Sequence, residues 1–230
     1  KNEAYKKSYD EFLCYDRIKF KLSQLEVKRK NAVLDLGCGK GQALHAIKNN
    51  GFCGRYTGID NDADLIKTAT THFKKGKNSL LPEFIQGDCT DILVKKNKFD
   101  LILVWGILSF YDDHMHFLNL LSDCVSERGE ISLWGGFTEN DYNVFVKYKK
   151  SDGELSNGLN MVGTSVIKDY FTSRKFSVKM FKFPISIDLE RDSTNPLKTW
   201  TEKTKEGRLL INGLNIVRSF YHIVLTKDHE

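Results

Sequence analysis

Short apolar runs alternate with amphipathic stretches along the first part of the chain. Five of these runs have the length and composition of buried strands; they cover residues 32–36, 55–60, 84–86, 99–105 and 130–135. Apolar residues spaced three and four apart predict helices that follow some of these runs, at 41–47, 62–69 and 116–125. Because strands and helices alternate, the pattern predicts a doubly wound, mostly parallel sheet.

The remainder of the chain has a different pattern. Apolar positions at 142–148 and 166–171 predict two short helices. Alternation at 176–183 and 219–226 predicts a sixth and a seventh strand, which pair antiparallel. Residues 199–204 and 208–212 flank a glycine turn and predict an inserted β-hairpin.

A glycine-rich turn follows the first strand, where residues 33–42 read Val-Leu-Asp-Leu-Gly-Cys-Gly-Lys-Gly-Gln. Asp35 lies at the end of this strand, and a buried carboxylate there needs a partner or a ligand. Gly37, Gly39 and Gly41 allow positive φ and close backbone approach, and the following helix directs free N–H groups toward the same crevice. Gln42 stands where dinucleotide-binding turns continue their glycine pattern, so a nicotinamide-dependent oxidoreductase is disfavoured.

This turn resembles motif I of the class I S-adenosylmethionine (SAM) dependent methyltransferases. Asp60 ends the second strand near the spacing of roughly 20 residues at which an acid binds ribose hydroxyls, while Asp62 suits the N-cap of the next helix. The resemblance implies that Asp88 binds the adenine amino group, although Gly87-Asp88 is also an ordinary turn signal. The implied cofactor is SAM, and the implied binding residues are Asp35, Gly37, Cys38, Gly39, Gly41, Asp60, Asn61, Asp88, Cys89, Val104 and Trp105.

The resemblance also implies a domain organisation. The fold class is α/β: a Rossmann-like doubly wound, seven-stranded, mostly parallel sheet with an antiparallel last strand and the inserted β-hairpin. Residues 1–230 are expected to form a single methyltransferase domain. Within it, residues 1–30 are an N-terminal helical cap, 31–137 the SAM-binding core, and 138–230 the acceptor-side elements with the last two strands.

Composition narrows the class of protein. With 230 residues, 40% of them hydrophobic, the chain can bury a full core, and its longest apolar stretch is too short to span a bilayer. The five cysteines form no Cys-x-x-Cys pair, which predicts no metal site. Their odd number, with no secretory signal, predicts a cytoplasmic location. The net charge of +5 is mild, and no Asp/Asn/Ser-Pro-Pro-aromatic motif follows the fourth strand, so nucleic acid is disfavoured as a partner.

Candidate catalytic residues follow the fourth strand. His114 is the candidate general base and Tyr111 the candidate for orienting the acceptor; a histidine in an acidic helix start also suits a cap or a solvated side chain. Methyl transfer needs a nucleophile held about 3–3.5 Å from the methyl carbon. A hydroxyl acceptor also needs a base, whereas a carboxylate, with an ordinary pKa near ~4, is already ionised.

The C-terminal pattern Thr201-x-Lys203-Thr204 with His222-x-x-Leu225 resembles uncharacterised members of the family that are associated with sugar and capsule synthesis. We therefore predict O-methylation of a small polar acceptor, a sugar or uronic-acid nucleotide in capsule polysaccharide biosynthesis. The alternatives are N-methylation of an amine or a nucleic-acid base, and a noncatalytic SAM-binding partner subunit. No membrane partner is expected, and a homodimer is an open alternative to a monomer.

Overall fold

A computed structural model of the chain describes residues 16–74, 80–95, 97–149, 151, 153–195, 197–205 and 207–228. They form two compact units. The first contains the described residues up to Leu103 and the segment Leu120–Ile131, and the second contains Val104–Asn119 and the residues from Ser132 onward. The strands β4 (Phe99–Trp105) and β5 (Val125–Thr138) each begin in the first unit and end in the second.

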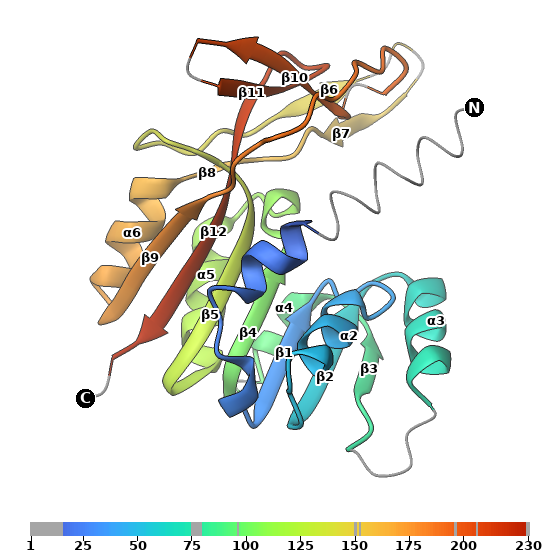
Figure 1. Ribbon diagram of the computed structural model, residues 1–230, viewed down its shortest axis with the longest axis vertical. Helices are drawn as coiled ribbons and strands as arrows, with labels where there is room; N and C mark the ends of the chain where they lie inside the picture. The colour runs from blue at the N-terminus through green and yellow to red at the C-terminus, as the bar shows by residue number, and fades with distance from the viewer. Residues whose placement is uncertain are drawn as a thin grey trace. The chain divides into compact units, whose positions relative to one another are not determined.

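The first unit is built on parallel strands (Figure 1). Its strands are β1 (Ala32–Leu36), β2 (Arg55–Asp60), β3 (Glu83–Gln86) and the first parts of β4 and β5, in the order β5-β4-β1-β2-β3. β2 pairs in parallel with β1 on one side and with β3 on the other. All five residues of β1 are buried, because parallel strands are covered on both faces.

The helices of the first unit place their apolar residues inward. They are a helix over residues 16–22, the 3-10 turn η1 (Val27–Arg29), α2 (Gln42–Asn49), α3 (Ala63–Phe73) and α4 (Cys89–Leu93). In α2 the buried residues are Ala43, Leu44 and Ile47, which recur at helical spacing. Asp62 caps α3, since its side chain accepts hydrogen bonds from the backbone N–H groups of Asp64 at 2.9 Å and Leu65 at 3.0 Å. Within the N-terminal cap predicted over residues 1–30, residues 16–22 and 27–29 are helical, residues 1–15 lie outside the described residues, and the role as a cap stays a prediction.

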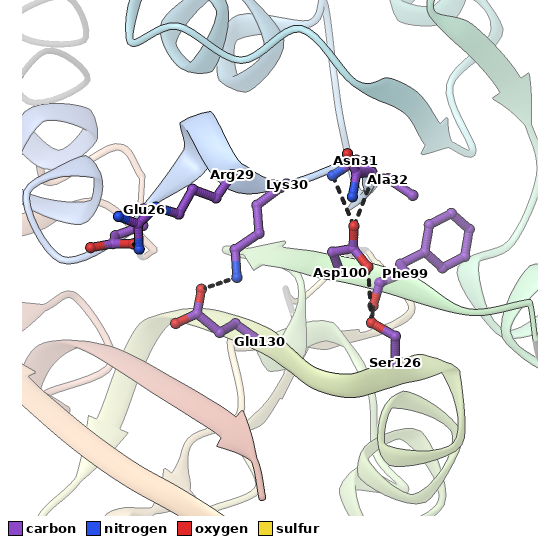
Figure 2. A network of polar contacts seen from close by, with 9 residues as sticks. All are labelled: Glu26, Arg29, Lys30, Asn31, Ala32, Phe99, Asp100, Ser126 and Glu130. Atoms are coloured by element: carbon purple, nitrogen blue, oxygen red, sulfur yellow. Dashed lines mark hydrogen bonds and ion pairs between the residues drawn. The ribbon is translucent and has the colours of Figure 1, made fainter. Parts of the chain in front are cut away.

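A polar network joins the starts of β1, β4 and β5 (Figure 2). Asp100 accepts hydrogen bonds from the backbone N–H groups of Asn31 at 2.8 Å and Ala32 at 3.2 Å, and from the Ser126 hydroxyl at 3.0 Å. Lys30 and Glu130 form a 2.6 Å ion pair in which each side chain is less than one fifth exposed. Burial would raise the pKa of Asp100, but these hydrogen bonds outweigh burial and lower it.

Asp100→Ala is expected to lower the free energy of unfolding by about 1–3 kcal/mol, because it leaves the Ala32 N–H buried without its acceptor. Since the pKa of Asp100 is lowered in the folded state, its contribution is present above the unfolded pKa and is lost as the pH falls toward the folded pKa. Urea denaturation at neutral and acidic pH measures both effects. Asp91→Ala, an exposed acid of α4, is the control; equal losses in both variants would contradict the prediction.

The second unit carries antiparallel strands. Beyond the ends of β4 and β5, its elements are η2 (Leu108–Phe110), the start of α5 (His114–Cys124), β6 (Lys147–Lys149), β7 (Leu155–Asn157), β8 (Val162–Gly163), α6 (Thr164–Thr172), β9 (Phe176–Lys182), β10 (Thr199–Thr204), β11 (Gly207–Asn212) and β12 (Val217–Lys227). β12 pairs antiparallel with β9 and with β11, and β11 pairs antiparallel with β10. β8 pairs in parallel with the end of β5. Figure 1 shows α6 alongside β9.

The structure extends one expectation and corrects another. The described residues contribute ten strands to the larger sheet, because the hairpin strands β10 and β11 and the short β8 join the seven expected strands, and two more strands form a separate hairpin. Residues 142–148 were expected to be helical, but Val144 forms an antiparallel bridge with Met161 and β6 begins at Lys147. The segment contains two valines and three aromatic residues, and β-branched and aromatic residues favour extended backbone. Among the described residues, no helix is long and apolar enough to cross a membrane.

Candidate functional site

The glycine turn after β1 is held against the end of β2. The backbone N–H groups of Gly37 and Cys38 both donate to the Ile59 carbonyl, at 2.8 and 2.9 Å. Gly37, Gly39 and Gly41 have φ values of +73°, +54° and +82°. These are left-handed conformations that glycine adopts without strain, so the sequence pattern predicted the backbone correctly.

Close packing adds a second reason for glycine in this region. A Cβ on Gly41 would lie 2.6 Å from the Phe73 ring, and a Cβ on Gly58 would lie 2.9 Å from the Cys38 sulfur. Cys38 therefore fills the space above the Gly58 backbone and is itself only 4% exposed. Burial raises the pKa of the Cys38 thiol, so this cysteine is a packing residue of the turn and not a reactive thiolate.

Asp60 lies where the glycine turn, β2 and β3 meet. One carboxylate oxygen accepts a hydrogen bond from the Gly39 N–H at 2.9 Å, and the other accepts one from the Asp62 N–H at 3.0 Å. The Gly87 N–H donates to the Asp60 carbonyl at 3.0 Å, which holds the end of β3 beside it. A carboxylate has about four acceptor positions. Two positions therefore stay available for hydroxyl donors from a ligand.

Asp35 is buried below the turn and has a protein partner. Its carboxylate accepts a hydrogen bond of 2.5 Å from the Tyr56 hydroxyl. Burial raises the pKa of Asp35 to about 6, although the Tyr56 hydrogen bond and the positive charge of Lys21 oppose the rise. Burial also raises the pKa of Tyr56 well above its ordinary value. The sequence alone did not identify Tyr56 or Lys21 as partners.

The raised pKa of Asp35 predicts how the free energy of unfolding depends on pH. The folded state holds this proton more tightly than the unfolded state between about pH 4 and pH 6, so stability decreases as the pH rises through that window. A shift of about two pKa units corresponds to roughly 3 kcal/mol. Asp35→Asn is expected to remove this dependence, as urea denaturation at pH 4.5 and pH 7.5 would show. If the free energy of unfolding changed with pH equally in the wild type and in Asp35→Asn, the prediction would be contradicted.

Asp88 ends the third strand and caps α4. A single oxygen of its carboxylate, Oδ1, accepts hydrogen bonds from the Thr90 N–H at 2.8 Å and the Thr90 hydroxyl at 2.5 Å. Asp88 and Asn61 are exposed, whereas Cys89 is buried. The prediction that Gly87-Asp88 forms a turn is therefore correct. The second carboxylate oxygen of Asp88 remains available to accept a hydrogen bond from a ligand.

A cavity of about 1040 Å³ lies beside the glycine turn in the first unit. Residues 18–23, α2 and α3 line it, and it reaches the turn at Lys40 and Gly41. Its basic lining residues are Lys19, Lys40, His45 and His72. Neither Asp60 nor Asp88 lines it, so the cavity is separate from the carboxylates of the candidate cofactor site.

Comparison with known proteins identifies the segment that carries this turn. Residues 33–129 match the family model described as a methyltransferase domain. Residues 33–129 are a methyltransferase domain. The chain therefore contains a methyltransferase domain, which is an enzyme domain, and its cofactor is S-adenosylmethionine. No curated protein matches the chain in sequence.

Solved structures of other proteins share the fold. A putative SAM-dependent methyltransferase from Listeria monocytogenes is 12% identical, with a TM-score of 0.66 over 94% of this chain and 100% of that chain. The DhpI–SAH complex is 14% identical, with a TM-score of 0.56 over 96% and 88%. The plantazolicin methyltransferase BpumL, in complex with a monoazolic desmethylPZN analog and SAH, is 15% identical, with a TM-score of 0.55 over 99% and 90%. At these identities the likeness shows a common fold.

The residues of the methyltransferase domain fit this cofactor. The glycine turn offers a backbone that a ligand can approach closely, Asp60 has acceptor positions for two hydroxyl groups, and Asp88 has one uncommitted oxygen. When bound, SAM supplies a methyl group on a sulfonium, which is electrophilic. These chain residues would hold the donor in place, and positioning is a large part of the catalysis that such a displacement needs.

Val104 and Trp105, the last predicted cofactor residues, belong to the second unit. Val104 is fully buried. The Trp105 indole N–H donates to the Ser132 hydroxyl at 2.8 Å, and that hydroxyl lies 2.8 Å from Nε2 of the buried His222. Trp105 is therefore held by a hydrogen-bonded chain inside its own unit, and its cofactor role stays a prediction.

His114 and Tyr111 also lie in the second unit, at the start of α5 and before it. His114 is 2% exposed, and neither ring nitrogen has a hydrogen-bond partner among the described residues. Burial lowers the pKa of His114, while the nearby charges of Asp112 and Asp113 oppose the shift. The Tyr111 ring stacks on Phe117 with centroids 4.2 Å apart. His114 is thus neither a helix cap nor a solvated side chain. Tyr111 packs against Phe117, and its role in orienting the acceptor stays a prediction.

Proposed function

We propose that this methyltransferase transfers the methyl group to an oxygen of a small polar acceptor, a sugar or uronic-acid nucleotide. The observation that supports this best is His114, a buried imidazole whose nitrogens have no hydrogen-bond partner among the described residues. Leaving a buried polar group without a partner costs free energy, so such a group in a native protein calls for an explanation. A proton-transfer role with a bound acceptor supplies one.

The protonation state of His114 favours a hydroxyl acceptor. Its lowered pKa keeps the imidazole neutral at physiological pH, and a neutral imidazole can accept a proton. When bound, SAM would supply the methyl group that the acceptor oxygen takes up, and His114 would accept the proton that this hydroxyl loses. A carboxylate acceptor would leave the imidazole without this role.

The test is a screen of nucleotide sugars and small acids with methyl-labelled SAM. We expect a labelled ether on a sugar hydroxyl, stable to mild base. A base-labile methyl ester would show that the acceptor group is a carboxylate and not a hydroxyl. A label on nitrogen would overturn O-methylation. SAM binding without turnover on any acceptor would instead favour the noncatalytic partner subunit.

A further inference from the structure

The His114 imidazole is covered by one aromatic side chain. The Phe145 ring stacks on it with centroids 5.3 Å apart and planes inclined by 19°. His114 is 2% exposed, whereas Phe145 is 52% exposed. Phe145 therefore forms the layer between solvent and this face of the imidazole.

The backbone on both sides of Phe145 is fixed. Val144 and Met161 exchange two hydrogen bonds, of 2.8 and 2.9 Å. On the other side, the Val146 N–H donates to the Asn160 side-chain oxygen at 2.9 Å, and the Gly158 N–H donates to the Val146 carbonyl at 2.7 Å. These bonds hold the backbone of both residues that flank Phe145.

Asn160 joins this strand to the segment that precedes His114. It is 1% exposed, and its backbone N–H donates to the Ser109 carbonyl at 2.9 Å. Its side-chain NH₂ donates to the Tyr111 carbonyl at 3.1 Å and to the Asp112 carboxylate at 2.8 Å. One buried amide thus fixes the covering residue and the covered residue relative to each other within the second unit.

We propose that Phe145 is a specificity-determining residue that gates access to His114, so that the acceptor must bring a ring to replace it on the imidazole. The proposal rests on the proposed function of His114 as the base. A ring face, from a sugar or an aromatic group, restores the stacking and apolar contact that Phe145 gives up. A small open-chain polyol presents no such face, so it does not compensate for the displaced ring.

Chemical modification tests the cover without any need for turnover. Diethyl pyrocarbonate modifies accessible imidazoles, and peptide mass spectrometry locates the modified histidine. Phe145→Ala is expected to accelerate modification of His114 about tenfold, because the stacking and apolar burial that protect it are lost. Tyr142→Ala is the matched control, since Tyr142 is an equally exposed aromatic residue nearby in sequence whose hydroxyl accepts from Asn140.

Phe145→Leu serves as a second variant if the alanine variant fails to fold; it is expected to give an intermediate rate. Equal His114 modification rates in the wild type and the folded Phe145 variants would overturn the gate. This outcome is distinct from failure of the base, which would appear as undiminished turnover in His114→Ala.

The preference for acceptors that carry a ring is tested separately in the Phe145→Ala protein. Phenyl β-D-glucopyranoside is expected to protect His114 from diethyl pyrocarbonate, whereas glycerol at the same concentration leaves the modification rate unchanged. Protection by both compounds, or by neither, would overturn the selection of ring-bearing acceptors. Modification of His116, an exposed histidine on the same helix, monitors any loss of reagent.

Discussion

His114→Ala is expected to slow methyl transfer by about 10²–10⁴-fold, the range that a positioned general base supplies. The physical reason is the pairing of a buried, neutral imidazole with an acceptor hydroxyl that must lose its proton during attack. SAM affinity should change little, because the proposed binding carboxylates Asp60 and Asp88 belong to the other unit. Single-turnover kinetics with labelled SAM, together with calorimetric titration of SAM, separate the two quantities.

The pH dependence of the rate gives an internal control for this prediction. The pKa of His114 is lowered from its ordinary value of 6.5, so the imidazole stays neutral at lower pH than a free imidazole does. We therefore expect kcat/KM to fall only at pH values below 6.5. The acidic limb should disappear in His114→Ala. His116→Ala, which changes an exposed histidine two positions along α5, should keep both the limb and the rate. Equal rates for wild type and His114→Ala would reject the base and favour a carboxylate acceptor.

Sequence pattern predicted the part of the fold that depends on local information. β1 and β2 have the expected bounds, and the glycine turn has the positive φ values that its residues allow. These features follow from short-range steric and hydrophobic rules. The strands that sequence pattern missed depend on distant partners: β8 has only two residues, and its pairing with Phe137 and Thr138 of β5 leaves no periodic signal.

The same distinction applies to the candidate site. Asp60 could be identified because an acid at a strand end, after a glycine turn, is a sequential pattern. Tyr56 as the partner of Asp35 depends on the register that pairs Val33 with Tyr56, which pattern alone does not fix. Phe145 on His114 depends in addition on an extended segment that was expected to be helical.

Asp60→Ala is expected to weaken SAM binding by about 100-fold. Two hydroxyl hydrogen bonds to a charged acceptor contribute roughly 1.5–3 kcal/mol each, and about 3 kcal/mol corresponds to that factor. The variant also removes the acceptor for the Gly39 and Asp62 N–H groups, so the turn itself loses order. Calorimetric titration of SAM measures the affinity. Asp60→Asn, which keeps one acceptor oxygen, should lie between the alanine variant and the wild type.

Asp62→Ala separates ligand binding from helix capping in this region. Asp62 lies two positions from Asp60, but its carboxylate accepts from the N–H groups of Asp64 and Leu65 at the start of α3. Losing this cap should lower the free energy of unfolding by about 1 kcal/mol. Because its backbone N–H still donates to Asp60, the affinity for SAM should stay within about threefold of the wild type, since a retained contact leaves the binding free energy nearly unchanged. Similar affinity losses in Asp60→Ala and Asp62→Ala would mean that order in the turn, and not direct contact with Asp60, determines SAM binding.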